Sequence, residues 1–309
     1  MGGEKFKILI VCSKNSGKIE AFVSDQAESL KMQGIKIDFF TLSQRGLFGY
    51  LRSRRELIQK IKDFQPQIVH AHYGLSGLLA NLQRCVPVIT TYHGSDINNP
   101  KILRFSKVAI FLSKFNIFVS QKNIELAKPQ KNYALIPCGV DIELFEPLDK
   151  AECREKLGLK NDEKLVLFSS GLDNQIKNPA LAKAVMKLLP NVKLLELQGY
   201  TREQVCLLMN AVDAVLMTSF TEGSPQFVKE AMAVNCPIVS VDVGDVKEVV
   251  GDTEGCFVCS PSEKEIADAL KSILNINKRT LGRKKVLKFD NQLVAEKIIE
   301  IYDKVMARK

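Results

Sequence analysis

Tryptophan is absent from this chain of 309 residues, and histidine is scarce, with only three copies. No apolar run approaches the roughly 20 residues that a membrane-spanning helix requires. The opening Met1-Gly-Gly-Glu-Lys5 lacks the apolar segment of a signal peptide. We therefore expect a cytoplasmic chain without a transmembrane segment.

Metal-binding and phosphate-loop patterns are also missing. The chain has no D-x-D pair, and Asp252-Thr-Glu254 is typical of a loop. Cys256 and Cys259 form a C-x-x-C without a second pair, and the eight scattered cysteines indicate reduced thiols rather than a disulfide framework. A Walker loop at 13–18 would need glycine in place of Cys12 and Ser or Thr in place of Ile19. We expect no metal site.

The positive charge is confined to the first half of the chain. Residues 1–140 carry a net charge of +11 and residues 141–309 a net charge of −2, which gives the overall +9. A basic surface suits nucleic acid, an anionic membrane or an acidic acceptor. Because no RNA-binding signature or helix-turn-helix pattern is present, the sequence does not favour nucleic acid.

Short apolar strands alternate with amphipathic helices along the whole chain, which predicts parallel sheets covered on both faces. The segment 137–147 contains a glycine and two prolines, which predicts a domain boundary with domains 1–140 and 141–290. The final helix, from Asn291 to Met306, is followed by no strand. The expected strands are 6–12, 35–42, 68–72, 88–92, 117–120, 164–169, 192–197, 214–217, 237–241 and 256–258, and among the expected helices are 19–32 and 50–64.

Two glutamates stand eight positions apart in the run from Glu222 to Glu230, on either side of a Gly-Ser-Pro turn. Pro225 suits the first position of a helix, because its φ is preset and its missing N–H is not needed there. A helix N-terminus binds anions through free N–H groups. The segment therefore predicts a phosphate site with a carboxylate on each side, which is the layout of a nucleotide sugar. Solvated glutamates on an ordinary helix are the alternative.

This spacing resembles the E-x7-E signature of glycosyltransferase family 4. Three further segments resemble the family's motifs: Phe64 to His72, the hinge Ile136 to Phe145, and Val212 to Glu222. The resemblance implies a GT-B fold, in which two Rossmann-like doubly wound domains face a central cleft. It also implies that the C-terminal helix, within 291–309, crosses back to pack on the first domain, and that the sugar is transferred with retention and without a metal.

The resemblance assigns roles to residues of the second domain. Glu222 meets the donor sugar, Glu230 the ribose and Lys177 the diphosphate, in a loop that starts at Gly171. The family's Arg and Gly of that loop are replaced by Leu172 and Asn178. The segment from Gly223 through Ser224, Pro225, Gln226 and Phe227 is expected at the donor, where the backbone N–H groups of its residues other than Pro225 could bind the phosphate and sugar, as is the small-residue loop at Gly244. Asp245 is a candidate N-cap for the helix that follows it.

In the first domain, His93 lies in Thr90-Thr-Tyr-His-Gly-Ser-Asp96 and matches the family's H-G-x-D motif, which places it at the donor sugar near the reacting centre. Asn15, Ser16, Gly17 and Asp96 are expected in loops that line the cleft on the acceptor side. His70 and His72 are period-2 neighbours on a buried strand, which indicates packing. A histidine bonded to loop backbone is the alternative for His93.

The function that these features imply is a transferase moving a hexose-type sugar from a UDP- or GDP-sugar to a glycan or lipid-linked acceptor, in building surface polysaccharide. We expect no cofactor beyond the nucleotide-sugar co-substrate. The basic stretch from Arg45 to Arg55 predicts contact with an anionic inner membrane face, and a solvated helix is the alternative. Two other functions stay open: a glycan- or partner-binding protein without turnover, and a nucleotide-sugar epimerase.

Overall fold

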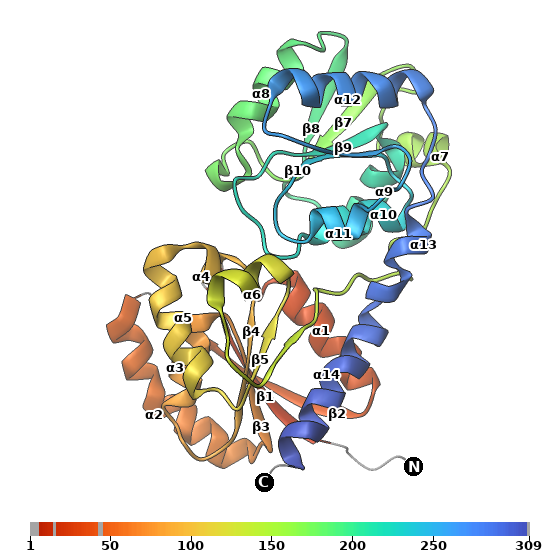
Figure 1. Cartoon of the computed structure of the whole chain (residues 1–309). Coiled ribbons are helices and arrows are strands. Elements are labelled where there is room, and N and C mark those ends of the chain that lie inside the picture. Colours follow the sequence, from red (N-terminus) through yellow and green to blue (C-terminus); the bar gives the residue numbers. More distant parts are fainter. Residues whose placement is uncertain (1–5, 15–16, 43–45, 308–309) are drawn as a thin grey trace. The chain divides into compact units, whose positions relative to one another are not determined.

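The computed structural model describes residues 6–14, 17–42 and 46–307, with only the helical backbone described for 46–52. The chain divides into two compact units (Figure 1). The first unit comprises Met1–Gly139 and Asn291–Lys309, and the second comprises Val140–Asp290.

The first unit contains a six-stranded sheet in which every paired strand is parallel. Its order is β2-β1-β3-β4-β5-β6. β2 is added on one side of β1 and the later strands on the other side, so the strand order has its switch point between β1 and β3. The strands are β1 (Phe6–Ser13), β2 (Ile35–Leu42), β3 (Ile68–His72), β4 (Val88–Tyr92), β5 (Phe115–Phe118) and β6 (Tyr133–Leu135).

Successive side chains of a strand point to opposite faces of the sheet, so the apolar strands present apolar side chains on both faces. Helices cover both of these faces. Ile8 and Ile10 of β1 join the core under α1 and α14, whereas Leu9 and Val11 join the core under α2 and α3. In Figure 1, α14 runs alongside α1. The helices are α1 (Ala21–Met32), α2 (Gly46–Phe64), α3 (Gly74–Asn81), α4 (Ser95–Asn98), α5 (Pro100–Leu112), α6 (Gln121–Ala127) and α14 (Asn291–Met306).

The second unit contains a five-stranded parallel sheet of order β11-β10-β9-β7-β8. β8 is added on one side of β7 and the later strands on the other side, so the strand order has its switch point between β7 and β9. The strands are β7 (Lys164–Phe168), β8 (Val192–Glu196), β9 (Ala214–Met217), β10 (Ile238–Val241) and β11 (Cys256–Cys259). Helices pack on both faces, so the predicted pair of doubly wound parallel sheets is confirmed. The helices are α7 (Lys150–Lys156), η1 (Gln175–Lys177), α8 (Pro179–Lys187), α9 (Arg202–Ala211), α10 (Gln226–Ala233), α11 (Val246–Val250), α12 (Glu263–Ile276), α13 (Arg283–Val286) and η2 (Leu287–Phe289).

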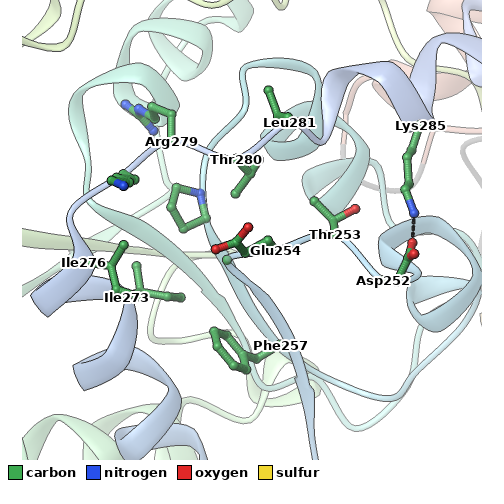
Figure 2. A pocket seen from close by; sticks show the side chains of 13 residues that line it. Asp252, Thr253, Glu254, Phe257, Ile273, Ile276, Arg279, Thr280, Leu281 and Lys285 are labelled. Carbon is green, nitrogen blue, oxygen red and sulfur yellow. Dashed lines mark hydrogen bonds and ion pairs between the residues drawn. The ribbon is translucent and has the colours of Figure 1, made fainter.

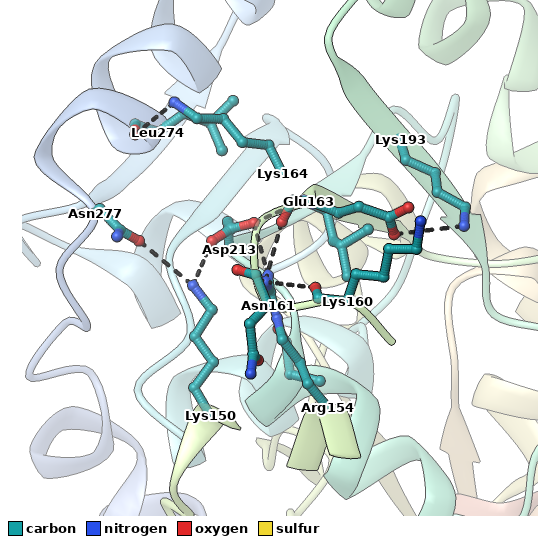
Figure 3. Close-up of polar contacts among 12 residues, drawn as sticks. Lys150, Arg154, Lys160, Asn161, Glu163, Lys164, Lys193, Asp213, Leu274 and Asn277 are labelled. Atoms are coloured by element: carbon teal, nitrogen blue, oxygen red, sulfur yellow. Dashed lines mark hydrogen bonds and ion pairs between the residues drawn. The ribbon is translucent and has the colours of Figure 1, made fainter. Parts of the chain in front are cut away.

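A buried arginine joins α7 to this sheet (Figure 3). Arg154 is 2% exposed, and its NH2 atom lies 3.1 Å from Oδ2 of Asp213. Its other guanidinium nitrogens donate to four backbone carbonyls at 2.8 to 3.1 Å, those of Lys160, Asn161, Glu163 and Ala211. The same carboxylate oxygen of Asp213 accepts from the backbone N–H of Leu165 at 2.6 Å. Every branch of the buried guanidinium is therefore satisfied.

Several predicted boundaries were wrong by a few residues. The strand expected at 117–120 is β5, at Phe115–Phe118, because the side chain of Ser120 instead caps α6. Pro225 lies at the N-cap of α10 rather than inside its first turn. The short edge strand β6 was not predicted, and α2 begins four residues before the expected Tyr50. None of the helices within the described residues is both long and apolar enough to cross a bilayer.

Candidate functional site

The carboxyl ends of β7 and β9 bring Lys177 and Glu222 together in the second unit. Nζ of Lys177 lies 2.6 Å from Oε1 of Glu222, and the two side chains are 23% and 14% exposed. One residue follows β7 and the other follows β9, the two strands between which the sheet order reverses. In doubly wound sheets, ligands bind in the crevice at such a switch point.

Two buried hydroxyls mark the same edge of the sheet. Ser169 directly follows β7 and Ser219 lies just after β9, and the two residues are 7% and 2% exposed. Neither Oγ atom has a hydrogen-bond partner among the described residues. Buried polar groups are normally paired. These two hydroxyls are therefore candidates for contact with a ligand. Ser219 lies within the motif segment Val212 to Glu222, whereas Ser169 lies in none of the segments that resemble the family.

The loop that carries Lys177 is fixed by its backbone. The residue after it, Asn178, adopts a left-handed conformation with φ of 53° and caps α8 by accepting from the N–H of Leu181 at 3.3 Å. Asparagine tolerates this conformation better than most residues with a side chain. The exchange of the family's glycine for Asn178 thus preserves the turn. Thr218 secures it by donating its hydroxyl to the carbonyls of Lys177 and Asn178, both at 2.9 Å.

Leu172, by contrast, cannot replace the family's arginine, because its side chain carries no charge. Its side chain packs against the core between the sheet and α8, and its N–H donates to Oε2 of Glu196 at 2.7 Å. A Cβ atom at Gly171 would lie 2.2 Å from Oε1 of Gln198, so the end of that flexible side chain would have to shift. Of the two cations that the family places in this loop, the chain therefore keeps only Lys177.

The Gly-Ser-Pro turn is held against the loop at Gly244 by a buried polar cluster. Oγ of Ser224 donates to Oδ2 of Asp245 at 2.6 Å. Nζ of the fully buried Lys229 contacts the same oxygen at 3.0 Å and also Oγ of Ser224. Asp245 lies at the predicted N-cap position of α11, but its side chain makes no capping hydrogen bond. Ser224 therefore has a structural role through its side chain.

Glycine is required where these two loops meet. Gly244 has φ of 56°, and a Cβ atom at this position would lie only 2.4 Å from the carbonyl oxygen of Gly223. A side chain here would separate the loops. Their close approach keeps the backbone of the Gly-Ser-Pro turn beside the N-terminus of α10, where Gln226 begins the helix and the side chain of Phe227 is buried.

The second glutamate of the pair has its own cation. Glu230, with a side chain 5% exposed, forms an ion pair with Arg202 at the start of α9. The guanidinium of Arg202 also stacks over the ring of Phe145, 4.8 Å from its centroid. Glu222 and Glu230 are thus each paired with a basic residue, and the sequence pattern had identified neither Arg202 nor this pairing.

The first unit places His93 in an aromatic cluster at the end of β4. Its Nε2 lies 2.9 Å from Nδ1 of His72, and its Nδ1 lies 3.8 Å from Sγ of Cys138. The ring also packs against Phe22 and Tyr73, with centroids 4.5 and 4.9 Å away. Burial lowers the pKa of His93 to about 3, so the imidazole is neutral at pH 7. It can act through hydrogen bonds rather than as a cation.

His70 and His72 were expected to be packing residues, and both are fully buried. His70 also bonds to Oη of Tyr302 at 2.7 Å and to Oγ1 of Thr91 at 2.8 Å. Burial lowers the pKa of His70 to about 3, and burial with the two neighbouring histidines lowers the pKa of His72. His72 therefore has a role beyond packing, because it hydrogen-bonds the ring of His93.

Asp96 holds the loop after β4 in place. Its Oδ1 accepts from the N–H groups of His93 and Gly94, both at 3.0 Å, and its Oδ2 accepts from the N–H of Gly74 at 2.9 Å. Burial raises the pKa of Asp96 to about 6, against the opposing effect of these bonds. Gly17, with φ of 82°, is exposed after β1. Asn15 and Ser16 lie outside the described residues.

The stretch from Arg45 to Arg55 is described only in part. Arg45 and the side chains up to Arg52 lie outside the description. Nε of Arg54 donates to the carbonyl of Leu82 at 3.0 Å, so this cation is engaged within the unit.

A pocket of about 470 Å³ opens elsewhere in the second unit (Figure 2). It lies beside Pro237 and Gly255, which precede β10 and β11, and is therefore at the amino ends of the strands. Phe257, Ile273 and Ile276 form an apolar side, and Lys285 pairs with Asp252 at the rim. This pocket contains none of the predicted site residues. Elsewhere too, no group of three or more His, Cys, Asp or Glu side chains within the described residues is placed to hold a metal ion.

Two family models match the chain, one for each unit. The model described as Glycosyltransferase Family 4 matches residues 5–144, and the model described as Glycosyl transferases group 1 matches residues 152–275. Among curated proteins, the putative teichuronic acid biosynthesis glycosyltransferase TuaC of Bacillus subtilis is 25% identical, over 68% of this chain and 62% of its own length. D-inositol 3-phosphate glycosyltransferase of Mycobacteroides abscessus is 26% identical, over 67% of this chain and 58% of its own length. The chain thus spans about 60% of the length of these relatives.

Solved structures share the fold. Sucrose-phosphate synthase of Thermosynechococcus elongatus superposes with a TM-score of 0.85 at 18% identity, covering 99% of this chain and 100% of that chain. HepE of Anabaena, solved in complex with UDP-glucose, superposes with a TM-score of 0.72 at 20% identity, covering 97% and 100%. With both units matched by the family models and the GT-B fold shared with these neighbours, the chain belongs to glycosyltransferase family 4.

Proposed function

We propose that the chain is a retaining, metal-independent glycosyltransferase that moves a hexose-type sugar from a UDP- or GDP-sugar to a glycan or lipid-linked saccharide. The observation that carries the proposal is the pairing of Lys177 with Glu222 at 2.6 Å, between the carboxyl ends of β7 and β9. A cation and a carboxylate at this switch point suit the two chemical parts of a nucleotide sugar, the diphosphate and the sugar hydroxyls.

Departure of a nucleoside diphosphate concentrates negative charge on the leaving phosphate. Stabilising such charge is usually the largest catalytic contribution, and Lys177 is the cation at this position. Glu222 holds the ammonium group of Lys177 in place and accepts a hydrogen bond from a hydroxyl of the donor sugar. The backbone from Gly223 to Phe227, at the start of α10, adds N–H donors and the positive end of a helix. No metal is needed for this stabilisation.

Glu230 and His93 are assigned the two remaining roles. Glu230 accepts hydrogen bonds from the ribose hydroxyls, and its ion pair with Arg202 fixes the orientation of its carboxylate. His93, neutral and hydrogen-bonded to His72, offers a polar group to the sugar without a positive charge that would repel the developing oxocarbenium. The resemblance to family 4 supports the proposed retention.

The names of one relative and one structural neighbour bear on the substrates. HepE is a structural neighbour in complex with UDP-glucose, which favours a UDP-sugar donor. TuaC is named for teichuronic acid biosynthesis, which favours an acceptor in a surface polysaccharide. The net charge of +11 in residues 1–140 is compatible with a peripheral position at the inner membrane face, and flotation with anionic vesicles at low salt tests it.

The decisive experiment is a melting-temperature panel with UDP-, GDP-, ADP- and dTDP-sugars, each with EDTA. A donor at about 100 times its dissociation constant stabilises the folded state by about 2.7 kcal/mol. Lys177→Ala removes a charge-assisted contact of about 1.5–3 kcal/mol, so donor affinity falls roughly 10- to 150-fold. Lys183→Ala, an exposed lysine on α8, is the matched control and leaves the shift unchanged.

Activity assays on the purified protein distinguish the remaining possibilities, which concern the stereochemistry, the metal requirement and the type of function. Product with the donor's anomeric configuration, formed in EDTA, supports retention without a metal; inverted product or a strict metal requirement refutes that part. Glu222→Gln abolishes transfer in an enzyme, whereas a binding protein without turnover tolerates the change. An epimerase would convert the donor sugar without an acceptor. A panel in which no nucleotide sugar shifts the melting temperature overturns the proposal.

A further inference from the structure

A second pocket, of about 240 Å³, lies in the first unit at the carboxyl ends of its strands. Ser13 ends β1, Tyr73 follows β3, and Ser95 and Asp96 follow β4. The pocket therefore sits at the β1/β3 switch point, the position where doubly wound sheets bind ligands. Since a water molecule takes about 30 Å³ of liquid, the volume equals roughly eight waters, which is about the space of one monosaccharide.

The polar lining consists of hydroxyls and carboxylates. Ser13, Tyr73, Ser76 and Ser95 supply hydroxyl groups, and Glu20 and Asp96 supply carboxyl groups. No lysine or arginine lines the pocket among the described residues. Hydroxyls and a carboxylate beside an aromatic ring match the donors, acceptors and apolar face of an uncharged sugar.

The position where an anion would bind is already taken. The N-terminus of α3 is a potential anion site, but Oδ2 of Asp96 accepts from its first N–H, that of Gly74, at 2.9 Å. Oδ1 of the same carboxylate accepts from two further N–H groups. A phosphate or carboxylate of a ligand would meet these oxygens as a like charge, and no lining cation would compensate it.

Two lining groups are available to a ligand. The carboxylate of Glu20 stands at the N-cap of α1 without capping it, is exposed, and has no ion-pair partner in the part of the chain described. Ser76 is 1% exposed, and its Oγ finds no hydrogen-bond partner among the described residues. A buried hydroxyl left unpaired in the free protein has bonding capacity that a sugar hydroxyl would satisfy after a rotation of the serine side chain.

The backbone of Tyr73 adds an independent sign of function. Its φ of 73° and ψ of 149° lie near a region that is essentially restricted to glycine and costs about 1–3 kcal/mol. Such strain tends to persist at binding sites. It holds the ring 4.9 Å from that of His93 and at the wall of the pocket.

We propose that this pocket binds one uncharged sugar residue of the acceptor, with Glu20 and Ser76 as the residues that select hydroxyl groups over anions. The proposal rests on the proposed glycosyl transfer and names the class of acceptor. It sets this chain apart from relatives whose names specify anionic compounds, inositol 3-phosphate and L-malate.

The test uses saturation-transfer NMR on the whole chain with its donor nucleotide, identified by the melting panel. The probes are methyl glycosides of glucose, galactose, mannose and N-acetylglucosamine, together with the 6-phosphates of the first three and methyl glucuronide. We expect at least one neutral glycoside to bind and the anionic sugars to bind at least tenfold more weakly. Glu20→Gln and Ser76→Ala each weaken the neutral sugar roughly 10-fold or more, as for a hydrogen bond to a charged or buried group.

The control variant is Glu28→Gln, an exposed carboxylate on the same helix α1, which leaves both ligands unaffected. Donor-induced stabilisation persists in Glu20→Gln and Ser76→Ala, which shows that these variants fold. If the donor binds but no neutral glycoside does, or if a sugar phosphate binds more tightly than its neutral parent, this inference is wrong and the proposed transferase function stands. If both variants bind the neutral sugar as tightly as the parent chain, the assigned residues are wrong. If no nucleotide sugar binds, the proposed function itself fails.

Discussion

Lys229→Met tests whether the buried cluster at the Gly-Ser-Pro turn holds the second unit together. Methionine is close to lysine in length, so the substitution removes the ammonium group and leaves little cavity. Nζ of Lys229 is fully buried, 3.0 Å from Oδ2 of Asp245 and 5.2 Å from the ring centroid of Phe289. Its loss leaves the carboxylate of Asp245 buried with Ser224 as its remaining polar contact and with Oδ1 unpaired.

Breaking one partner of a buried ion pair costs about 3–5 kcal/mol, because an uncompensated charge remains. For a unit of about 150 residues, each kcal/mol lowers the melting temperature by about 2–4 °C. The expected decrease is therefore roughly 6–20 °C. Since the chain has no tryptophan, far-UV circular dichroism and calorimetry are better probes than fluorescence.

Two companion variants make the measurement specific. Lys247→Met removes an exposed lysine from α11 and should change stability by less than about 0.5 kcal/mol. The double variant Lys229→Met/Asp245→Asn removes the stranded charge and should regain at least half of the lost stability. A decrease below about 2 °C for Lys229→Met, or no recovery in the double variant, would refute the reasoning.

Three further predictions address other contacts. Arg154→Met should cost the second unit about 3–5 kcal/mol, whereas Lys193→Met, at an exposed pair 3.6 Å long, should cost less than about 1 kcal/mol by calorimetry. Gly244→Ala should abolish the donor-induced melting shift by forcing apart the two loops, whereas Gly158→Ala, with a similar φ of 65° but open space, should only lower stability by about 1–2 kcal/mol. All three histidines lie in the first unit with lowered pKa values, so below about pH 6.5 the unfolded state binds protons that the folded state does not. Because burial raises the pKa of Asp96 to about 6, its folded-state protonation offsets about one of these three protons, so the stability of that unit should fall by up to roughly 3 kcal/mol per pH unit on acidification. Hydrogen exchange, corrected for the intrinsic rate of the amides, should then show lower protection confined to that unit at pH 5.5, and a flat profile would contradict the assignment.

The strands were predictable because their pattern is local. The continuous apolar run from Phe6 to Cys12 is typical of a strand buried on both faces, and the structure places β1 there. The strand expected up to Ser120 was wrong because a serine side chain that caps a helix looks, in sequence, like the end of a strand. The three residues of β6 carry too little pattern to be recognised.

The site was predictable only where one segment carries it. The run from Glu222 to Glu230 is contiguous, so its two carboxylates stood out. Their partners are 45 and 28 residues away, at Lys177 and Arg202, and only the fold brings them near. Lys177 was found through its resemblance to the family's loop, whereas Arg202 had no such signal.

The burial of a lysine cannot be read from composition. Lysine is mostly exposed in proteins, yet Lys229, within the E-x7-E run, is fully buried. The same holds for His72, whose period-2 spacing indicates a buried strand and gives no hint of its bond to His93.

The division of the first unit between the two ends of the chain constrains how the protein is made. Val294, Ile298 and Tyr302 of α14 belong to the same apolar core as β1 and α1. On a translating ribosome, the first 139 residues emerge long before these side chains, so the part of the sheet face that α14 covers beside α1 remains exposed while the second unit is synthesised. Domains usually fold in order of emergence. Here the unit that begins first is completed last, because its apolar core includes side chains of α14 as far along the chain as Val305.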